Sequence, residues 1–270
     1  MKTRILTALV GVPLLIFALV VRGWFAELLI VLLTLIALDE CYKALRTAGY
    51  QVCTWGGYAA AVVMWPLSGF MGVLDPLLLV VGAMGISMLG VLLNRRPTFP
   101  DAAASVYPLF TCLLPFSMFM MMLNTTYGRV PGIALITMAF GIAYGCDALA
   151  YLGGRSFGRH KLCPFVSPKK TVEGAVSGLL GGVLLALLVR AFFVLVLNTP
   201  MPGIPAAVLL GVIGSVAGQV GDLTASLLKR HSGIKDYGKL FPGHGGVMDR
   251  FDSVIFALIV MYCYTLVLHG

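Results

Sequence analysis

Two aspartates and the polar residues between them are the part of this sequence best suited to chemistry. Asp222 and Asp249 bracket a stretch, residues 222–252, that also holds lysines, arginines and a glycine-rich turn. Carboxylate oxygens suit Mg²⁺, which proteins usually hold through one or two carboxylates, waters and substrate phosphates. Apolar runs precede this stretch at 208–220 and follow it at 254–268. An acid at a membrane edge is costly unless it is paired or metal-bound, so the pattern predicts a functional site.

Basic side chains and glycines surround the two aspartates. Lys229, Arg230, Lys235 and Arg250 would neutralise a polyphosphate, and backbone N–H groups in the glycine turn around His244 could bind phosphate oxygens. His244 itself could contact substrate or have only a structural role. The sequence has no Walker A or H-E-x-x-H motif, so the chemistry indicated is a metal-assisted phosphoryl or nucleotidyl transfer to a lipid.

A second candidate region begins at Asp147, which lies in an apolar run. Asp147 could pair with Arg155, or it could be a metal ligand or network acid facing Asp222. Further along, Ser167 and Pro168 predict the N-cap and first residue of a helix. Lys169 and Lys170 would then lie at a helix N-terminus, where the macrodipole disfavours cations, which is consistent with a bound anion. Ordinary positive charge on a cytoplasmic loop is the alternative.

The composition excludes a soluble globular protein. Hydrophobic residues make up 59% of the 270 residues and charged residues 11%, against about 25% charged in a soluble domain. The net charge of +8 is explained by basic cytoplasmic loops, so no nucleic-acid partner is expected. The six cysteines contain no C-x-x-C pair, which argues against a zinc site or a redox pair.

The apolar runs predict an all-α, polytopic integral membrane protein with about nine transmembrane helices. The predicted spans are 5–21, 24–45, 55–70, 77–93, 102–123, 133–152, 172–197, 204–228 and 253–268. Lysine and arginine gather in every second segment between these spans, and therefore on one side of the membrane. This bias predicts a cytoplasmic N-terminus and places loops 153–171 and 229–252 in the cytoplasm.

The sequence also suggests a division of roles. Residues 1–130 are predicted to be N-terminal membrane helices on the structural, lipid side, and residues 131–270 the catalytic helices. In the first part, Asp39 and Glu40 are the only acids that look buried. An interfacial pair satisfied by Lys43, one turn along the helix, is the favoured interpretation.

Three segments of the polar stretch together resemble a known family. They are Ser226-x-Leu228-Lys229-Arg230, then Lys235-Asp236-x-Gly238, then Phe241-Pro242-x-His244-Gly245-Gly246-Val247-x-Asp249-Arg250-Phe251-Asp252. Two upstream segments, Asp147-x-x-Ala150-Tyr151-x-x-Gly154-Arg155-x-x-Gly158 and Ser167-Pro168-Lys169-Lys170-Thr171-x-Glu173-Gly174, fit as well. The pattern, over roughly residues 145–255, resembles the phosphatidate cytidylyltransferases (CDP-diacylglycerol synthases). The first half is similar only in hydropathy.

The resemblance implies that CTP and phosphatidate react to give CDP-diacylglycerol and pyrophosphate, for phospholipid biosynthesis. It further implies Mg²⁺, with a second cation left open, and a homodimer in the inner membrane with its active site facing the cytoplasm. The residues expected to be catalytic are Asp222, Lys229, Asp249 and Arg250, with Asp222 and Asp249 as metal ligands. Those expected to bind substrate are Asp147, Arg155, Lys169, Lys170, Arg230, Lys235, Asp236, His244, Gly245, Gly246 and Asp252.

Two other functions remain open from the residues alone. A CTP-dependent polyprenol or phytol kinase would use a similar metal site on an alcohol and release CDP. An ion-coupled transporter would use Asp147 and Asp222 as an ion relay, but this function leaves the basic glycine-rich loop unexplained.

Overall fold

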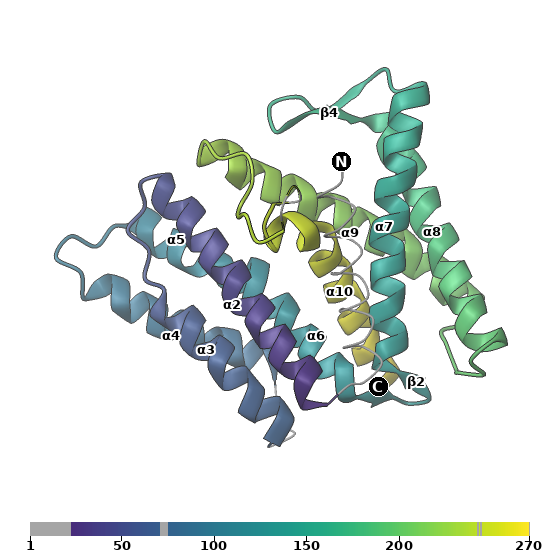
Figure 1. Ribbon diagram of the computed structural model, residues 1–270, viewed down its shortest axis with the longest axis horizontal. Helices are drawn as coiled ribbons and strands as arrows, with labels where there is room; N and C mark the ends of the chain where they lie inside the picture. The colour runs from purple at the N-terminus through teal and green to yellow at the C-terminus, as the bar shows by residue number, and fades with distance from the viewer. Residues whose placement is uncertain (1–22, 71–74, 242, 244, 270) are drawn as a thin grey trace. The chain divides into compact units, whose positions relative to one another are not determined.

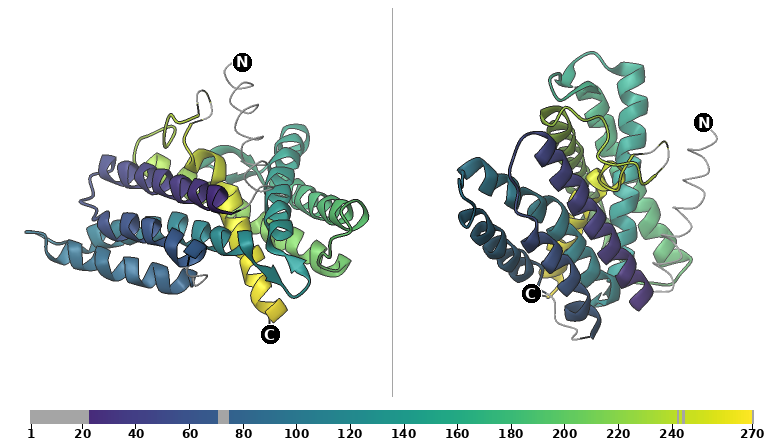
Figure 2. Two further views of the ribbon diagram at one scale, coloured as in Figure 1. Left: turned by 60° about the horizontal axis from the view of Figure 1, so that its bottom comes forward. Right: turned by 60° about the vertical axis from the view of Figure 1, so that its left-hand side comes forward.

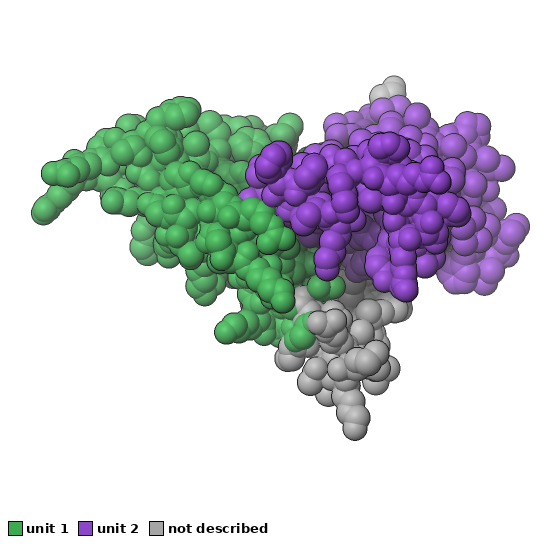
Figure 3. Space-filling view, turned by 90° about the horizontal axis from the view of Figure 1, so that it is seen from above, with its two compact units in different colours: residues 1–121, 228–251 green, residues 122–227, 252–270 purple. Residues whose placement is uncertain are grey.

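The computed structural model describes residues 23–70, 75–241, 243 and 245–269, most of them in helices (Figure 1). The chain divides into two compact units, coloured separately in Figure 3. Unit 1 comprises Met1–Met121 and Leu228–Phe251, and unit 2 comprises Met122–Leu227 and Asp252–Gly270. The predicted span at 5–21 lies outside the described residues. The proposed division of roles near residue 130 differs from this geometric division and stays a prediction.

Unit 1 is built on a row of helices whose starts follow from local sequence. Asp75 caps one of them by accepting N–H bonds from Leu77 at 2.8 Å and Leu78 at 3.2 Å, with Pro76 as the first helical residue. The elements are α2 (Trp24–Thr47), α3 (Trp55–Trp65), the π-helical turn η1 (Pro66–Phe70), α4 (Pro76–Leu92), α5 (Phe99–Pro108), η2 (Leu109–Leu113) and α6 (Leu114–Asn124), whose last residues belong to unit 2.

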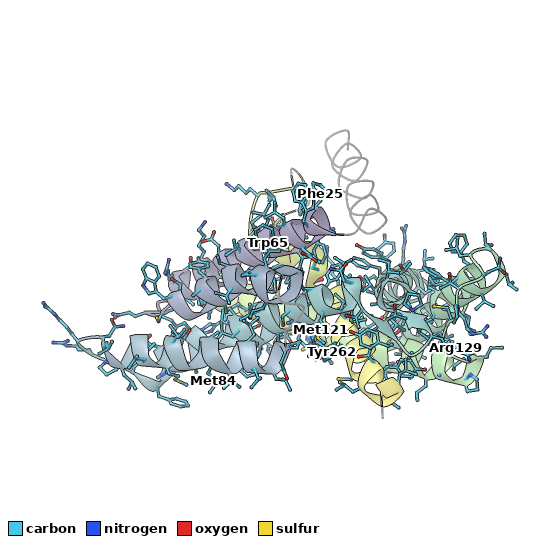
Figure 4. All side chains as sticks on the ribbon, turned by 90° about the horizontal axis from the view of Figure 1, so that it is seen from below. Phe25, Trp65, Met84, Met121, Arg129 and Tyr262 are labelled. Carbon is cyan, nitrogen blue, oxygen red and sulfur yellow. The ribbon has the colours of Figure 1, made fainter. Side chains whose placement is uncertain are left out.

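Helix α3 packs against both α2 and α4 (Figure 1). Figure 4 labels Phe25 on α2 and Trp65 on α3. The core of unit 1 includes three fully buried side chains, Leu38 and Tyr42 of α2 and Phe116 of α6. Phe116 also packs against Phe251, with ring centroids 5.7 Å apart, so the short C-terminal segment of unit 1 joins the same core.

Unit 2 contains long helices and two short strand pairs. The long helices are α7 (Gly132–Phe157), α8 (Val172–Leu195), α9 (Ile204–His231) and α10 (Met248–His269), of which α9 ends and α10 begins in unit 1. The strands β1 (Thr126–Tyr127) and β2 (Val130–Pro131) pair ahead of α7, and β3 (Lys161–Cys163) pairs with β4 (Ser167–Thr171) between α7 and α8.

Helices α7 and α8 lie side by side along much of their length (Figures 1 and 2). Their close approach depends on glycine. A Cβ atom added to Gly181 would collide with the backbone oxygen of Gly145, and one added to Gly174 would lie 2.8 Å from the backbone oxygen of Ala150. Small residues let membrane helices pack backbone to backbone in this way.

The helix expected to start at Ser167 starts later, so that prediction is wrong. Residues Ser167–Thr171 form β4, antiparallel to β3, and α8 begins at Val172. Thr171 is the N-cap, and its Oγ1 accepts the N–H of Gly174 at 3.1 Å. Pairing with β3 and a Thr cap outcompete the Ser-Pro cap, and proline is tolerated on the edge of a two-stranded sheet. Lys169 and Lys170 therefore precede the helix and are not part of its first turn.

The remaining predicted spans coincide closely with described helices. Among the described residues, five helical segments are long and apolar enough to cross a membrane: Phe99–Asn124, Gly132–Phe157, Val172–Leu195, Ile204–His231 and Met248–Leu268. Helix α4 is apolar but shorter. Because α7 and α9 run past their predicted ends and α10 begins earlier, each polar loop is shorter than expected.

Candidate active site

A cavity of about 400 Å³ in unit 2 contains several of the predicted site residues. Its lining comes from α7, the β3–β4 hairpin, α8 and α9. The lining residues are Asp147, Ala150, Tyr151, Gly154, Arg155, Leu162, Lys169, Lys170, Thr171, Gly174, Ala175, Gln219 and Asp222. The structure thus brings Asp147, Arg155, Lys169, Lys170 and Asp222 to one cavity, and their roles in binding substrate or metal stay predictions.

An ion pair lies in the wall of this cavity. Lys170 Nζ is 2.5 Å from Asp222 Oδ2, and the two side chains are 28% and 26% exposed. Ser226 Oγ, one turn further along α9, donates to Asp222 Oδ1 at 3.2 Å. The ammonium group therefore compensates the Asp222 charge while both groups stay accessible from the cavity.

Asp147 shares this cavity with Asp222, as one of the two interpretations of its sequence position expected. Ser253 Oγ donates to Asp147 Oδ2 at 3.5 Å. Arg155, the alternative partner, donates from Nη1 to Tyr151 Oη at 3.4 Å. Asp147 and Asp222 are consequently the two carboxylates that a ligand in this cavity would meet.

Asp252 lies beside the same part of α9. A Cβ on Gly221 would collide with the backbone oxygen of Asp252 and would lie 2.6 Å from the ring of Phe256, so α9 and α10 almost touch here. Asp252 Oδ1 accepts the backbone N–H of Ser253 at 2.8 Å. Because position 221 is glycine, α10 can approach α9 closely here. The predicted substrate residue Asp252 therefore lies next to the helix that carries Asp222.

Unit 1 holds a second lysine–carboxylate pair. Lys229 Nζ is 2.9 Å from Asp249 Oδ1, and the two side chains are 17% and 5% exposed. Asp249 Oδ2 accepts the backbone N–H groups of Tyr237 at 2.7 Å and Gly246 at 2.9 Å. Lys229 also lies 5.5 Å from the ring centroid of Tyr237, whose pKa is raised mainly by burial. Asp249 is therefore the residue that ties the loop to the start of α10.

The glycine turn before α10 is shaped around Asp249. Gly243 and Gly245 have φ angles of 78° and 84°, a region that L side chains rarely adopt. A Cβ on Gly245 would in addition lie 2.6 Å from Asp249 Oδ2. The Phe241 N–H donates to the oxygen of Gly245 at 2.9 Å and closes the turn. His244, predicted to bind substrate, lies outside the described residues.

The other predicted residues of this stretch are on the surface of unit 1. The exposed side chains are Arg230, Lys235, Asp236 and Arg250. Unit 1 thus contains Asp249, Lys229 and the glycine turn, whereas Asp222 and its cavity belong to unit 2. A single metal site formed by Asp222 and Asp249 stays a prediction.

Glu40 is the residue whose role the sequence did not reveal. The expected ion pair with Lys43 is formed by Asp39, at 2.5 Å, and not by Glu40. Glu40 Oε1 instead accepts the N–H of Val247 at 3.1 Å, and its Oε2 accepts the N–H of Met248 at 2.9 Å. The only available clue was an acid in an otherwise apolar helix, which does not identify the partner.

The donor groups of the cavity are compatible with a magnesium ion. Within the described part of the chain, no cluster of three or more His, Cys, Asp or Glu side chains could hold a metal. Mg²⁺ needs fewer protein ligands, because waters and substrate phosphates complete its shell. Asp222 and Asp147 offer two carboxylates on one cavity, whereas both oxygens of Asp249 already accept protein hydrogen bonds.

Comparison with known proteins gives a consistent result. The sequence model described as "Cytidylyltransferase family" matches residues 2–268. The chain is 36% identical over 269 residues to a phosphatidate cytidylyltransferase of Staphylococcus epidermidis, and 34% identical over 265 residues to that of Staphylococcus haemolyticus, covering 96% of each chain in both cases. Over 131 residues it is 44% identical to the phosphatidate cytidylyltransferase of Bacillus subtilis, covering 48% of this chain and 47% of the relative.

Proposed function

Because the chain belongs to the cytidylyltransferase family, we propose that it transfers CMP from CTP to phosphatidate, giving CDP-diacylglycerol and pyrophosphate. The observation that carries this proposal is the cavity of unit 2, where Lys170 pairs with Asp222 of α9 beside Asp147 of α7, both on helices of membrane-spanning length. Such a cavity offers carboxylates for a metal–nucleotide complex and cations for phosphate groups. The relatives named above are consistent with this substrate pair.

Positioning and charge compensation account for most of the chemistry. The phosphatidate phosphate attacks the α-phosphorus of CTP, and pyrophosphate leaves in line; such a transfer needs no covalent protein nucleophile. Lys169 and Lys170 on β4 bind the lipid phosphate. Lys229 and Arg250 stabilise the negative charge of the leaving pyrophosphate, which is the strongest contribution that fixed cations can make.

We assign Asp222 and Asp249 as the metal ligands, with Asp147 as a carboxylate of the substrate site. Asp249 accepts three protein hydrogen bonds, and a carboxylate has about four acceptor positions, so one remains for the ion. Bound Mg²⁺ would supply charge neutralisation to the triphosphate. The glycine turn contributes backbone N–H groups. The remaining basic residues hold phosphate oxygens; they are Arg155, Arg230 and Lys235. Asp236 and Asp252 orient basic side chains of the substrate site. His244, Gly245 and Gly246 complete the substrate contacts.

The decisive experiment is a turnover assay with the purified full-length chain, radiolabelled CTP, Mg²⁺ and phosphatidate in mixed micelles. The expected products are a CDP-lipid and pyrophosphate in equal amounts. Release of CDP with a phosphorylated polyprenol or phytol would establish a lipid kinase instead. Ion-driven substrate flux in vesicles without nucleotide turnover would establish a transporter.

We also propose the finer membrane arrangement. The chain crosses the inner membrane about nine times, with its N-terminus and both polar loops in the cytoplasm, where CTP is found. The distribution of lysine and arginine supports this orientation. Single cysteines replacing Ser156 and Lys239, both exposed, would test it on a cysteine-free background. Labelling of either position by a membrane-impermeant maleimide from the periplasm would overturn the orientation.

A homodimer is the assembly that we propose for the active protein. Its support is the family resemblance. Size-exclusion chromatography with light scattering in detergent would give the protein mass, and a monomer that retains full activity would refute it.

A further inference from the structure

The loop that precedes Asp249 is fixed at its end by an acid of helix α2, which is distant in the sequence. Glu40 lies on α2, is 5% exposed, and contacts the start of α10 within unit 1. Its two carboxylate oxygens each accept one backbone N–H, from Val247 and from Met248. The first N–H groups of a helix have no partner inside the helix, so a buried carboxylate satisfies two donors that would otherwise be unpaired.

Two glycines of the loop fit around this carboxylate. A Cβ on Gly246 would collide with both oxygens of Glu40, and a Cβ on Gly238 would collide with Oε1. Neither glycine has a left-handed backbone conformation, since the positive φ angles in the described part of residues 228–251 belong to Gly233, Gly243 and Gly245. Glycine at positions 238 and 246 is therefore required by the presence of Glu40 and not by the backbone conformation.

Glu40 and Asp249 act on successive amide groups. Asp249 accepts the N–H of Gly246, and Glu40 accepts those of Val247 and Met248. Three consecutive N–H groups at the start of α10 are thus fixed by two carboxylates, and Asp249 is the next residue in the chain. Any shift of Val247 and Met248 would displace Asp249 and, with it, the bond to Lys229.

We propose that Glu40 is a positioning residue for the transfer reaction, which holds the start of α10 so that Asp249 and Lys229 keep their orientation toward the nucleotide. This inference rests on the function proposed above. Glu40 acts through the loop, and the chemical requirement is a side chain that presents two acceptor oxygens. Glutamine offers only one oxygen and places an NH₂ group where the other amide needs an acceptor.

The test compares Glu40→Gln with Asp39→Asn, a matched control on the neighbouring residue. Asp39 accepts a bond from Tyr58 at 3.2 Å and pairs with Lys43, but has no role in the loop. Steady-state kinetics are measured separately for CTP and for phosphatidate. Glu40→Gln is expected to raise the KM for CTP, and thereby to lower kcat/KM for CTP at least ~10-fold, the loss of about one charge-assisted hydrogen bond. The KM for phosphatidate should stay within about twofold, and Asp39→Asn should match the parent protein in both.

This split separates positioning from a general loss of structure. Partial unfolding would reduce the amount of active enzyme, lowering kcat while leaving both KM values unchanged. Hydrogen exchange gives a readout that does not depend on activity: the Val247 and Met248 amides should exchange at least ~10-fold faster in Glu40→Gln, with α7 and α8 unaffected. Unchanged kinetics for CTP in folded Glu40→Gln would overturn the proposal.

Gly246→Ala provides a second route if Glu40→Gln does not fold. Its added methyl group presses on the Glu40 carboxylate from the loop side, so the same change in kcat/KM for CTP is expected. Combining it with Glu40→Ala should cost less than the sum of the two changes, because the collision disappears. Strict additivity would overturn the proposal. If the parent protein makes no CDP-lipid, the proposed function fails, whereas failure of Glu40 alone appears only in an active parent protein.

Discussion

The two lysine–carboxylate pairs of this protein differ in how far each is committed to the fold. In unit 2, Lys170 and Asp222 lie in the wall of a cavity, each about a quarter exposed, and the aspartate accepts only side-chain donors. In unit 1, Asp249 is 5% exposed and accepts two backbone N–H groups besides Lys229. The carboxylate of the first pair can therefore exchange its partner for a ligand, whereas the carboxylate of the second pair is also hydrogen-bonded to the backbone of a loop.

This difference shows that residue type and spacing do not determine how freely a carboxylate can change its partner. Lys170 can leave Asp222 for a phosphate at a low cost, since a solvent-accessible ion pair contributes only about 0–1 kcal/mol. Lys229 can leave Asp249 without releasing the loop, because the two backbone N–H groups remain. The changes below are expected to separate these two behaviours.

Asp249→Asn should have the largest effect, because it should lower both the catalytic activity and the stability of the protein. The amide has one acceptor oxygen, so Lys229 or one backbone N–H loses its partner at a cost of about 1–3 kcal/mol. CDP-lipid synthesis should fall at least ~10²-fold, and the thermal unfolding midpoint in detergent should fall by several degrees. A variant as stable as the parent protein would show that the loop does not depend on this carboxylate.

Asp222→Asn should lower activity just as much but leave stability intact. The lost charge removes a proposed metal ligand, so turnover should fall at least ~10²-fold, while the unfolding midpoint should stay within about a degree, because Lys170, which loses its partner, is partly exposed to solvent. The double variant with Asp249→Asn should lose little more activity than either single one. Near-normal turnover at limiting Mg²⁺ would refute the metal assignment of Asp222.

Gly245→Ala should produce an intermediate effect, confined to unit 1. Alanine at a φ of 84° is strained by about 1–2 kcal/mol, and its methyl group would press on the carboxyl group of Asp249. We expect about a tenfold loss in kcat/KM for CTP, the equivalent of 1.4 kcal/mol, and a small fall in the unfolding midpoint. Gly128→Ala is the matched control, since its φ is 60° and a Cβ there has nothing within 4 Å.

Replacing Lys169 and Lys170 together by glutamine should have the smallest effect. Both line the cavity of unit 2, and the loss of two partly exposed cations should raise the KM for phosphatidate about 5- to 10-fold, the equivalent of about 1 kcal/mol. The KM for CTP should change less. Lys43→Gln, which removes an ion pair on α2, is the control. An unchanged dependence on phosphatidate would reduce both lysines to determinants of membrane orientation.

The helices were largely predictable, because long apolar runs leave few alternatives to membrane helices. The predicted span at 204–228 corresponds to α9 (Ile204–His231), and the one at 133–152 to α7 (Gly132–Phe157). The β3–β4 hairpin was not predictable, since Ser167 and Pro168 form a good local cap and only pairing with Lys161–Cys163 reveals the strand. Local chemistry favoured a helix start, and pairing with a strand earlier in the chain decided for a strand.

The candidate site was predictable as a set of residues but not as an arrangement. The sequence identified Asp147, Lys170 and Asp222, and the structure places all three on one cavity. It could not show that Asp249 holds backbone N–H groups, because that depends on the turn at Gly245. Nor could it join Glu40 to Val247, because the two residues are 207 positions apart.

That separation also has a consequence for biosynthesis. The ribosome extends a chain by about 5–20 residues per second, so the carboxylate of Glu40 waits on the order of 10 seconds or more for its amide partners to be made. During that time α2 contains an acid without those partners, and unit 1 cannot close because its segment Leu228–Phe251 does not yet exist. A nascent chain stalled before Val247 would therefore keep unit 1 incomplete, with Glu40 of α2 still lacking both of its amide partners.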